Sequence, residues 1–281
     1  MRRLCVVIAY DGTFYAGWQR QQNAVSIQEV LEEAILRQFH ESVHVMGSGR
    51  TDAGVHALGQ VACFDFEHPI PCDKLLLALN ANLPEDIRIL EVKEVDPSFH
   101  PQYGAKRKTY GYRFLNGKIM LPQYRYNTHL VPEPLDIEKI RRALSLLEGE
   151  HDFAAFRASG GQNLTTVRKI YEAKLLRIPL AAVPLEMAGD HARATDKEAL
   201  EEAEAAAFGD DGALYEIRVT GNGFLYNMVR IIAGTMFDIG KGKLPVEVIE
   251  EAIATGDREV LGVTAPAKGL TLLNVEYEDR E

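Results

Sequence analysis

The segment Leu4-Cys5-Val6-Val7-Ile8-Ala9-Tyr10 is apolar and rich in β-branched residues, and Asp11-Gly12 follows it directly. An apolar run that ends at such a turn pair predicts a buried strand. Further along, Ser26 and Glu29 form an S-x-x-E capping box. Apolar residues then recur at helical spacing, which predicts a helix over about 26–40. The chain therefore opens with a strand and a helix, the beginning of an α/β unit.

Segments with strand patterns and segments with helix patterns follow one another through both halves of the chain. In the first half we expect strands over Val43–Met46, Val61–Phe66 and Ile87–Val95 and a helix over Cys72–Leu79. In the second half we expect strands over Arg107–Phe114, Thr166–Leu176, Ala213–Thr220 and Leu270–Tyr277, and helices over Asp136–Leu147, Phe224–Phe237 and Pro245–Ala254. A chain of 281 residues has the length of two domains. We therefore expect an N-terminal α/β domain over 1–100 and a C-terminal α/β domain over 101–281.

The composition is that of an ordinary globular protein, with 46% hydrophobic and 26% charged residues. The three cysteines, at positions 5, 63 and 72, form no C-x-x-C pair, which argues against a zinc ribbon or a redox motif and favours a reducing compartment. No apolar run reaches the roughly 18 residues of a membrane span. The short apolar N-terminus has no cleavage pattern. We expect a cytoplasmic protein.

Charge is distributed unevenly along the chain, whose net charge is −10. Residues 179–212 hold nine acids and two bases, a net charge of −7, and we interpret them as a solvated helical insertion. Residues 97–132 instead hold six cations and seven aromatic residues and no acid. Cations interleaved with aromatic faces suit phosphates and unstacked bases, although the same residues would also fit a core strand with solvated cations. An acidic protein can still bind RNA if its positive field is confined to one cleft.

The segment Gly47–Ala57 reads G-S-G-R-T-D-A-G-V-H-A and carries the most distinctive local pattern. Its three glycines predict a tight loop whose backbone can approach a ligand. Asp52 is the only carboxylate between Glu41 and Asp65. Four interpretations compete: a phosphate loop of unusual spacing, an aspartic-protease loop without its second carboxylate, a metal site at His56 without neighbouring ligands, and a structural turn in which Asp52 caps a backbone N–H.

A second feature is the segment Gly223–Gly234, which is apolar around most of a helix and therefore predicts a buried one. Arg230 lies within it, and a buried guanidinium needs an anionic partner. That partner is either a structural carboxylate or a catalytic one that Arg230 keeps ionised by lowering its pKa. Asp52 is a natural candidate for the catalytic case.

A third feature is the predicted strand that contains Tyr110, Tyr112 and Phe114. Alternate residues of a strand face the same side, so these three rings share one face. Tyr110 could stack on a base or take part in proton transfer, and the alternative is a cross-strand aromatic ladder. The opposite face carries Arg107, Thr109 and Arg113.

Several motifs together resemble the TruA-type tRNA pseudouridine synthases, and they occur in order over nearly the whole chain. They are Tyr10-Asp11-Gly12-Thr13, Tyr15, Gly17-Trp18-Gln19, Gly49-Arg50-Thr51-Asp52-Ala53-Gly54-Val55-His56-Ala57, Lys108-Thr109-Tyr110-Gly111-Tyr112, His151-Asp152-Phe153, Phe156-Arg157, Gly223-Phe224-Leu225-Tyr226-Asn227-Met228-Val229-Arg230 and Thr264-Ala265-Pro266-Ala267-Lys268-Gly269-Leu270. The G-R-T-D-A-G-V-H-A run is very specific. The chain departs from the pattern in the acidic stretch 179–212, which is longer than expected for the family and could alter the approach of RNA on its side.

The resemblance implies an α/β (α+β) fold: two RRM-like domains with mixed or antiparallel sheets, related by a pseudo-twofold axis, flanked by helices and separated by a central, basic catalytic cleft. It also implies a homodimer that handles the anticodon arm of tRNA. The implied activity is the isomerisation of uridine to pseudouridine at tRNA positions 38, 39 and 40.

The resemblance further implies roles for individual residues. Asp52 matches the catalytic aspartate, Tyr110 the tyrosine that packs at the base, and Arg230 the arginine that pairs with the aspartate. Arg50 is similar to a residue that helps to open the RNA and flip the base. Candidate RNA-binding residues are Arg20, Arg50, Lys106, Arg107, Lys108, Arg113, Arg157, Arg168 and Lys169.

The implied reaction breaks the N1–C1′ bond and makes a C5–C1′ bond, without redox change or net hydrolysis, so we expect neither cofactor nor metal. Asp52 would either attack C1′ or remove a proton from C2′. An alternative function is a non-catalytic RNA-binding module that uses the same basic cleft. A glycoside hydrolase would need a second carboxylate about 5–10 Å away, and the sequence offers none in a comparable loop.

Overall fold

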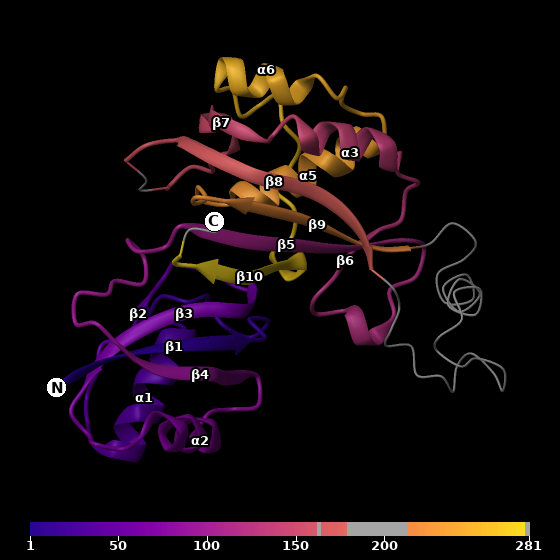
Figure 1. Cartoon of the computed structure of the whole chain (residues 1–281). Helices are drawn as coiled ribbons and strands as arrows, with labels where there is room; N and C mark the ends of the chain where they lie inside the picture. The colour runs from indigo at the N-terminus through magenta and orange to yellow at the C-terminus, as the bar shows by residue number, and fades with distance from the viewer. Residues whose placement is uncertain (162–163, 179–212, 279–281) are drawn as a thin grey trace. The chain divides into compact units, whose positions relative to one another are not determined.

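The computed structural model describes residues 1–161, 164–178 and 213–278. The chain forms two compact units, Met1–Tyr110 with Thr271–Glu281, and Gly111–Leu270. Figure 1 shows the elements of each unit. The expected helical insertion at 179–212 lies outside the described residues. No helix in the described part is both long and apolar enough to cross a membrane.

The first unit is a mixed sheet with two helices on one face (Figure 1). Its strand order is β4-β1-β3-β10, and the short β2 pairs with β3. β1 runs antiparallel to both β3 and β4, whereas β10 runs parallel to β3. The elements are β1 (Arg2–Tyr10), α1 (Ile27–Phe39), β2 (Met46–Gly47), β3 (His56–Phe66), α2 (Cys72–Asn82), β4 (Ile87–Val95) and β10 (Leu270–Glu276).

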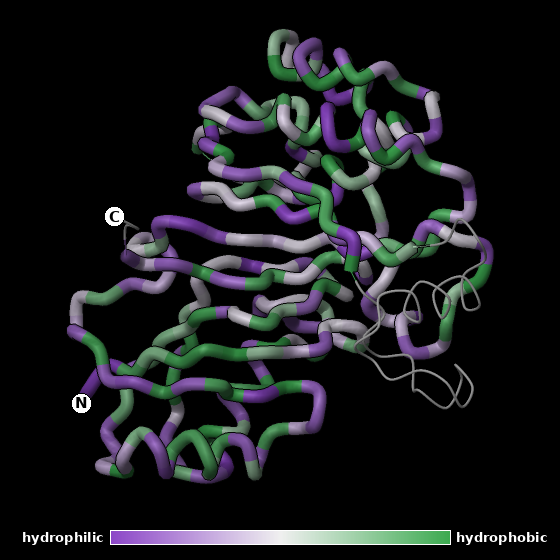
Figure 2. Tube along the Cα trace, turned by 45° about the vertical axis from the view of Figure 1, so that its right-hand side comes forward, coloured by the Kyte–Doolittle hydropathy of each residue, from purple (hydrophilic) through white to green (hydrophobic). Residues whose placement is uncertain are grey.

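The first strand is largely buried, as its apolar sequence predicts. Leu4, Val6, Ile8 and Tyr10 are all buried, and they join the apolar faces of α1 and α2 in one core. Figure 2 shows both hydrophobic and hydrophilic residues along these helices, as expected of helices with one buried face. The prediction of a buried strand from this segment is confirmed.

Helix α1 begins where the capping box predicts. The Ser26 side chain accepts a hydrogen bond from the backbone N–H of Glu29 at 3.3 Å. The helix ends at His40, which has a left-handed conformation with φ 57°. The prediction of a helix over about 26–40 is therefore confirmed to within a residue at each end.

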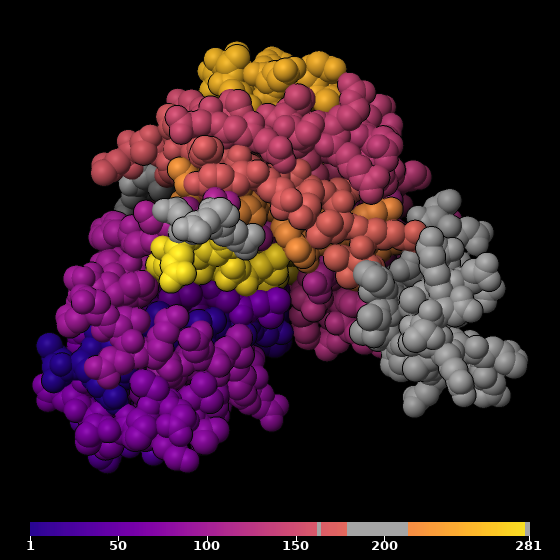
Figure 3. Space-filling model, in the orientation of Figure 1, coloured from indigo at the N-terminus to yellow at the C-terminus, as the bar shows by residue number. Residues whose placement is uncertain are grey.

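The last strand of the chain belongs to the first unit. Thr271 pairs with His56 and Leu272 with Ala57 in the parallel ladder between β10 and β3. In the space-filling view, the yellow atoms of β10 lie against the violet and indigo atoms of that unit (Figure 3). The sequence-based division into domains 1–100 and 101–281 placed this strand in the C-terminal domain. That division stays a prediction.

The second unit is a sheet of order β5-β9-β8-β7, with β6 beside β5. β9 and β7 both run antiparallel to β8, and β6 runs parallel to β5. Helix α5 supplies much of the core, since Phe237 packs against Tyr112 and Phe114. The elements are β5 (Arg107–Asn116), β6 (His129–Val131), α3 (Ile137–Ser145), β7 (Gly149–Asp152), β8 (Val167–Ile178), β9 (Ala213–Gly221), α5 (Met228–Gly240) and α6 (Val248–Thr255).

Two predicted elements begin later in the structure than in the sequence pattern. The helix expected from Phe224 begins at Met228, because Asn227 takes a left-handed conformation with φ 61°. The strand expected over Val43–Met46 is only Met46–Gly47. Side chains of α1 bind both backbone groups of Val45, so these groups are not available to a strand ladder.

Candidate active site

Asp52 lies in the loop of residues 48–55 that joins β2 to β3, and its side chain is partly exposed. The loop closes by a hydrogen bond from the N–H of Val55 to the carbonyl of Asp52 at 3.1 Å. Gly54, inside this turn, has φ 77°, a conformation that favours glycine. The loop thus presents a carboxylate from a tight turn, as the glycine pattern predicts.

The beginning of the loop is held by a set of hydrogen bonds at Ser48 and Gly49. The backbone N–H of Ser48 donates to Val61 at 2.7 Å, and its hydroxyl donates to the Gln60 side-chain oxygen at 2.7 Å. Gln60 in turn donates to the carbonyl of Gly49 at 3.0 Å. Lys108 Nζ donates to the carbonyl of Ser48 at 2.6 Å. We call these contacts the loop clamp.

The residue before Asp52 is held by the N-terminal motif. The N–H of Trp18 donates to the carbonyl of Thr51 at 3.0 Å, and the hydroxyls of Tyr10 and Thr51 lie 2.8 Å apart. Gly17 has φ 92°, and a Cβ there would lie 2.4 Å from the Thr51 carbonyl. Sequence reasoning missed this support, because it treated the motif around Tyr10 and Trp18 only as part of a resemblance.

His56 lies at the end of the loop and is buried. Its Nδ1 accepts a hydrogen bond from the N–H of Gly12 at 3.1 Å and lies 3.2 Å from Asp11 Oδ1. The two contacts exclude each other, because an Nδ1 that accepts from Gly12 carries no proton to donate to Asp11. Within the described ranges, no group of three His, Cys, Asp or Glu side chains could hold a metal ion.

Tyr110 is a residue of β5 that packs against the core of the first unit. Burial raises the pKa of its phenol above the usual range, and the charge of Asp52, together with that of Tyr10 once ionised, raises it further. Tyr110 and Asp52 therefore lie within electrostatic reach of each other. The phenol therefore stays neutral over a wider range of pH, and the role of Tyr110 stays a prediction.

Arg230 lies in the first turn of α5 and is partly buried. Its Nε donates to the carbonyl of Ala265 at 2.8 Å, and its Nη1 donates to Asn227 Oδ1 at 2.8 Å. The carbonyl of Arg230 accepts from the N–H of Ala265 at 3.0 Å. A Cβ on Gly234 would lie 1.7 Å from the carbonyl of Val263, so this glycine allows residues 263–265 to pack against the helix. The carboxylate partner expected for Arg230 stays a prediction.

Comparison of the sequence with known proteins shows the family to which the chain belongs. A family model described as tRNA pseudouridine synthase matches residues 6–104 and 143–278. The chain belongs to the tRNA pseudouridine synthase family. It is therefore an isomerase that modifies tRNA, and the resemblance found in the sequence is confirmed.

Individual relatives match this tRNA pseudouridine synthase over its whole length. Proteins named tRNA pseudouridine synthase A from Thermoanaerobacter sp. (strain X514), Citrifermentans bemidjiense and Ligilactobacillus salivarius are 40%, 39% and 41% identical to it. The alignments cover 99%, 100% and 100% of this chain and 100%, 99% and 98% of those proteins. Among solved structures, the "Crystal Structure of a Cbf5-Nop10-Gar1 Complex" matches 96% of this chain and 48% of that chain at 11% identity, with a TM-score of 0.34.

The candidate RNA-binding residues of this synthase occur in both units and differ in their surroundings. Arg50 and Lys106 are exposed, whereas Arg113 forms an ion pair with the buried Glu216 at 3.4 Å. Burial lowers the pKa of Arg168. Lys169 lies 5.6 Å from the ring centre of Tyr171. The first unit carries Arg20, Arg50, Lys106, Arg107 and Lys108, and the second carries Arg113, Arg157, Arg168 and Lys169.

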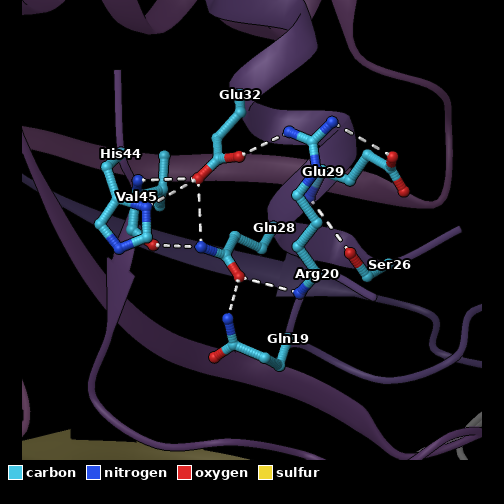
Figure 4. A network of polar contacts seen from close by, with 8 residues as sticks. All are labelled: Gln19, Arg20, Ser26, Gln28, Glu29, Glu32, His44 and Val45. Atoms are coloured by element: carbon cyan, nitrogen blue, oxygen red, sulfur yellow. Dashed lines mark hydrogen bonds and ion pairs between the residues drawn. The ribbon is translucent and has the colours of Figure 1, made fainter. Parts of the chain in front are cut away.

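Arg20 differs from the other candidates because two carboxylates already bind it (Figure 4). Its Nη1 lies 3.0 Å from Glu32 Oε2, and its Nη2 lies 3.5 Å from Glu29 Oε1. Its backbone N–H also donates to the side chain of Gln28 at 2.9 Å. An arginine paired in this way contributes little net positive field, and its contact with RNA stays a prediction.

Proposed function

We propose that this synthase converts uridine to pseudouridine at positions 38, 39 and 40 in the anticodon arm of tRNA, with Asp52 as the catalytic carboxylate. The reaction breaks the N1–C1′ bond, turns the uracil and joins C5 to C1′. The proton that leaves C5 is replaced by one at N1, so atoms and charge balance without an oxidant or water being consumed. Asp52 acts in its ionised form, either as a nucleophile at C1′ or as a base at C2′.

The observation that carries this proposal is the way the Asp52 loop is held. The loop clamp holds Ser48 and Gly49, and Trp18 with Tyr10 holds Thr51. Catalytic groups need such support, because a misplacement of about 1 Å can lower a rate about a hundredfold. A turn with a purely structural purpose would not need a partly exposed carboxylate at its tip.

Tyr110 is proposed to pack against the target base. The uracil must leave the base stack to reach Asp52, at a cost of a few kcal/mol. Stacking on an aromatic ring offsets about 1–3 kcal/mol of that cost per base. The raised pKa keeps the ring neutral beside Asp52, so that it adds no like charge there.

Arg230 is proposed as the counter-ion of Asp52, in agreement with the family resemblance. Its bonds to Asn227 and Ala265 occupy Nη1 and Nε and fix the plane of the guanidinium. An opposite charge close to a carboxylate lowers its pKa by about 1–3 units. A guanidinium held in this way would stabilise the negative charge that Asp52 carries in the proposed reaction.

Three further expectations belong to this proposal and rest on the resemblance. They are the two RRM-like sheets about a pseudo-twofold axis with a central basic cleft, the homodimer and the cytoplasmic location. Light scattering of the purified chain tests the homodimer, because a dimer has twice the mass of 31.3 kDa. Binding of tRNA is expected to weaken steeply with salt, because phosphate contacts release counter-ions.

The experiment that tests the function uses tRNA labelled with tritium at C5 of uridine. Isomerisation exchanges the C5 proton with water, so the enzyme is expected to release tritium from tRNAs that carry uridine at position 38, 39 or 40, with no added cofactor. A tRNA without uridine at these three positions is the matched control. Release from the control at the same rate would refute the assignment of positions, and no release from any tRNA would refute the activity.

A further inference from the structure

Lys108 lies on β5 two residues before Tyr110, so both side chains face the same side of the strand. Lys108 Nζ donates to the carbonyl of Ser48 at 2.6 Å. A Cβ on Gly49 would lie only 3.0 Å from the same nitrogen. The ammonium group therefore lies directly against the main chain at the beginning of the Asp52 loop. One face of β5 thus supplies Tyr110 near Asp52 and Lys108 at the base of its loop.

The surroundings of this ammonium are unusual for a lysine. Lys108 is partly buried, and lysines withdrawn from solvent are normally paired with a carboxylate. Within 1–161, 164–178 and 213–278, however, no carboxylate forms an ion pair with Lys108. Burial without such a partner lowers its pKa to about 8. Withdrawing an ammonium group from water costs free energy, which its hydrogen bond to Ser48 partly offsets.

The hydrogen bond completes the polar contacts of Ser48. The N–H and hydroxyl of this residue are bound by Val61 and Gln60, and its carbonyl is bound by Lys108. Hydrogen bonds from a charged donor are about twice as strong as neutral ones. Lys108 is therefore the strongest single contact of the loop clamp, and it acts four residues before Asp52.

We propose that Lys108 is a positioning residue, whose ammonium group holds the Ser48 carbonyl and thereby orients Asp52 for the isomerisation. This inference rests on the proposed function, because it takes Asp52 to be the catalytic carboxylate. It gives Lys108 a task different from the RNA contact expected from the sequence. Lys106, two residues earlier, is exposed and is better placed for a phosphate.

The test compares the chemical step with binding in Lys108→Met. Single-turnover release of tritium is measured at saturating tRNA, and the tRNA dissociation constant is measured separately by filter binding. The expected result is a rate lowered about tenfold to a hundredfold with a dissociation constant within about twofold of the wild type. Lys74→Met, on the exposed side of α2, is the matched control and is expected to change neither value.

A rescue experiment separates positioning from a general loss of packing. Lys108→Cys is prepared together with Cys72→Ser and treated with 2-bromoethylamine, which restores an ammonium group at nearly the original length through a thioether. The treated protein is expected to regain most of the single-turnover rate. The same treatment of the Cys72→Ser protein alone is expected to leave the rate unchanged, because Cys5 and Cys63 are buried.

Three results would overturn the inference. One is an unchanged single-turnover rate in Lys108→Met with weaker tRNA binding, which would make Lys108 a phosphate contact. Another is wild-type behaviour in both measurements. The third is a folded, aminoethylated protein that stays as slow as untreated Lys108→Cys. Full activity of Asp52→Asn would instead refute the proposed function, so the two failures are distinguishable.

Discussion

The hydroxyls of Tyr10 and Thr51 lie 2.8 Å apart in the buried interior of the first unit. Tyr10 is the last residue of β1, and Thr51 precedes Asp52 in the loop between β2 and β3. This bond joins the first strand of the chain to the loop that carries Asp52, the proposed catalytic carboxylate. It gives a structural task to the tyrosine that ends β1.

Tyr10→Phe is expected to lower the free energy of unfolding by about 1–3 kcal/mol, because it leaves the Thr51 hydroxyl buried without this partner. Urea unfolding, followed by the fluorescence of the single tryptophan Trp18, measures the change. The centre of the Trp18 ring lies 6.2 Å from that of Tyr10. Tyr103→Phe, at a ring that is 81% exposed, is the control and should cost almost nothing. Equal losses in the two variants would show that the bond contributes nothing.

Gly17→Ala is expected to destabilise the protein more than Gly160→Ala. Both glycines have a positive φ, of 92° and 89°. An added Cβ at Gly17 would meet the carbonyl of Thr51 at 2.4 Å, whereas at Gly160 it would meet nothing within 4 Å. Gly160→Ala should therefore cost about 1 kcal/mol for its conformation, and Gly17→Ala a further 1–3 kcal/mol, roughly as for overpacking. Thermal and urea unfolding of both variants test this, and similar losses would contradict the close packing of residues 17 and 51.

Arg230→Met is expected to lower the single-turnover rate about tenfold to a thousandfold while tRNA affinity changes little, because it removes the proposed counter-ion of Asp52. Arg230→Lys should restore little of the rate, since lysine cannot reproduce the planar guanidinium bonds to Asn227 and Ala265. Arg258→Met removes similar bonds to Leu261 and Thr264 and serves as the control. It is expected to lower stability without affecting the rate at saturating tRNA. Wild-type turnover in Arg230→Met would refute the pairing with Asp52.

Histidine 129 gives the second unit a predictable dependence on pH. Burial lowers its pKa to about 4, and the positive charges of Lys268 and Lys241 act in the same direction. In the unfolded chain the imidazole takes up a proton near its ordinary pKa of about 6.5. Between pH 6.5 and 4 the unfolded state therefore binds more protons, and stability falls as the pH falls.

The measurement for His129 is the difference in unfolding free energy between the wild type and His129→Gln across that pH range. The wild type is expected to lose more stability than the variant between pH 6.5 and 4, because the variant lacks the imidazole that protonates on unfolding. The difference isolates this side chain from carboxylates that titrate in both proteins. Parallel pH profiles would show that His129 is not held in its neutral form.

Much of the fold follows from local pattern. The apolar runs at residues 4–10 and 87–95 and the capping box at Ser26 predict elements that the structure contains almost to the residue. Short or polar elements such as β6 and β7 were missed because three or four residues carry too weak a periodic signal. The start of α5 was missed because nothing in the sequence letters requires the left-handed conformation of Asn227.

The candidate site was only partly predictable. Asp52 stands out because a single carboxylate in a glycine-rich loop suggests a charge that is accessible to a ligand. The groups that hold its loop are distant in sequence: Lys108 is 60 residues from Ser48, and Tyr10 is 41 residues from Thr51. No local pattern indicates such distant contacts. Gly17 shows the same limit, since its need for a positive φ depends on the fold rather than on its neighbours in sequence.

The most direct measurement is tritium release and tRNA binding by Asp52→Asn. The substitution keeps the size of the side chain and removes its negative charge. Release from tRNA labelled at C5 of uridine is expected to stop, while the tRNA dissociation constant and the thermal unfolding midpoint stay close to those of the wild type. Asp65→Asn, at a carboxylate bound to Arg3 on β1, is expected to release tritium at the wild-type rate. Continued release by Asp52→Asn at a rate near that of the wild type would contradict the assignment of Asp52 as the catalytic carboxylate.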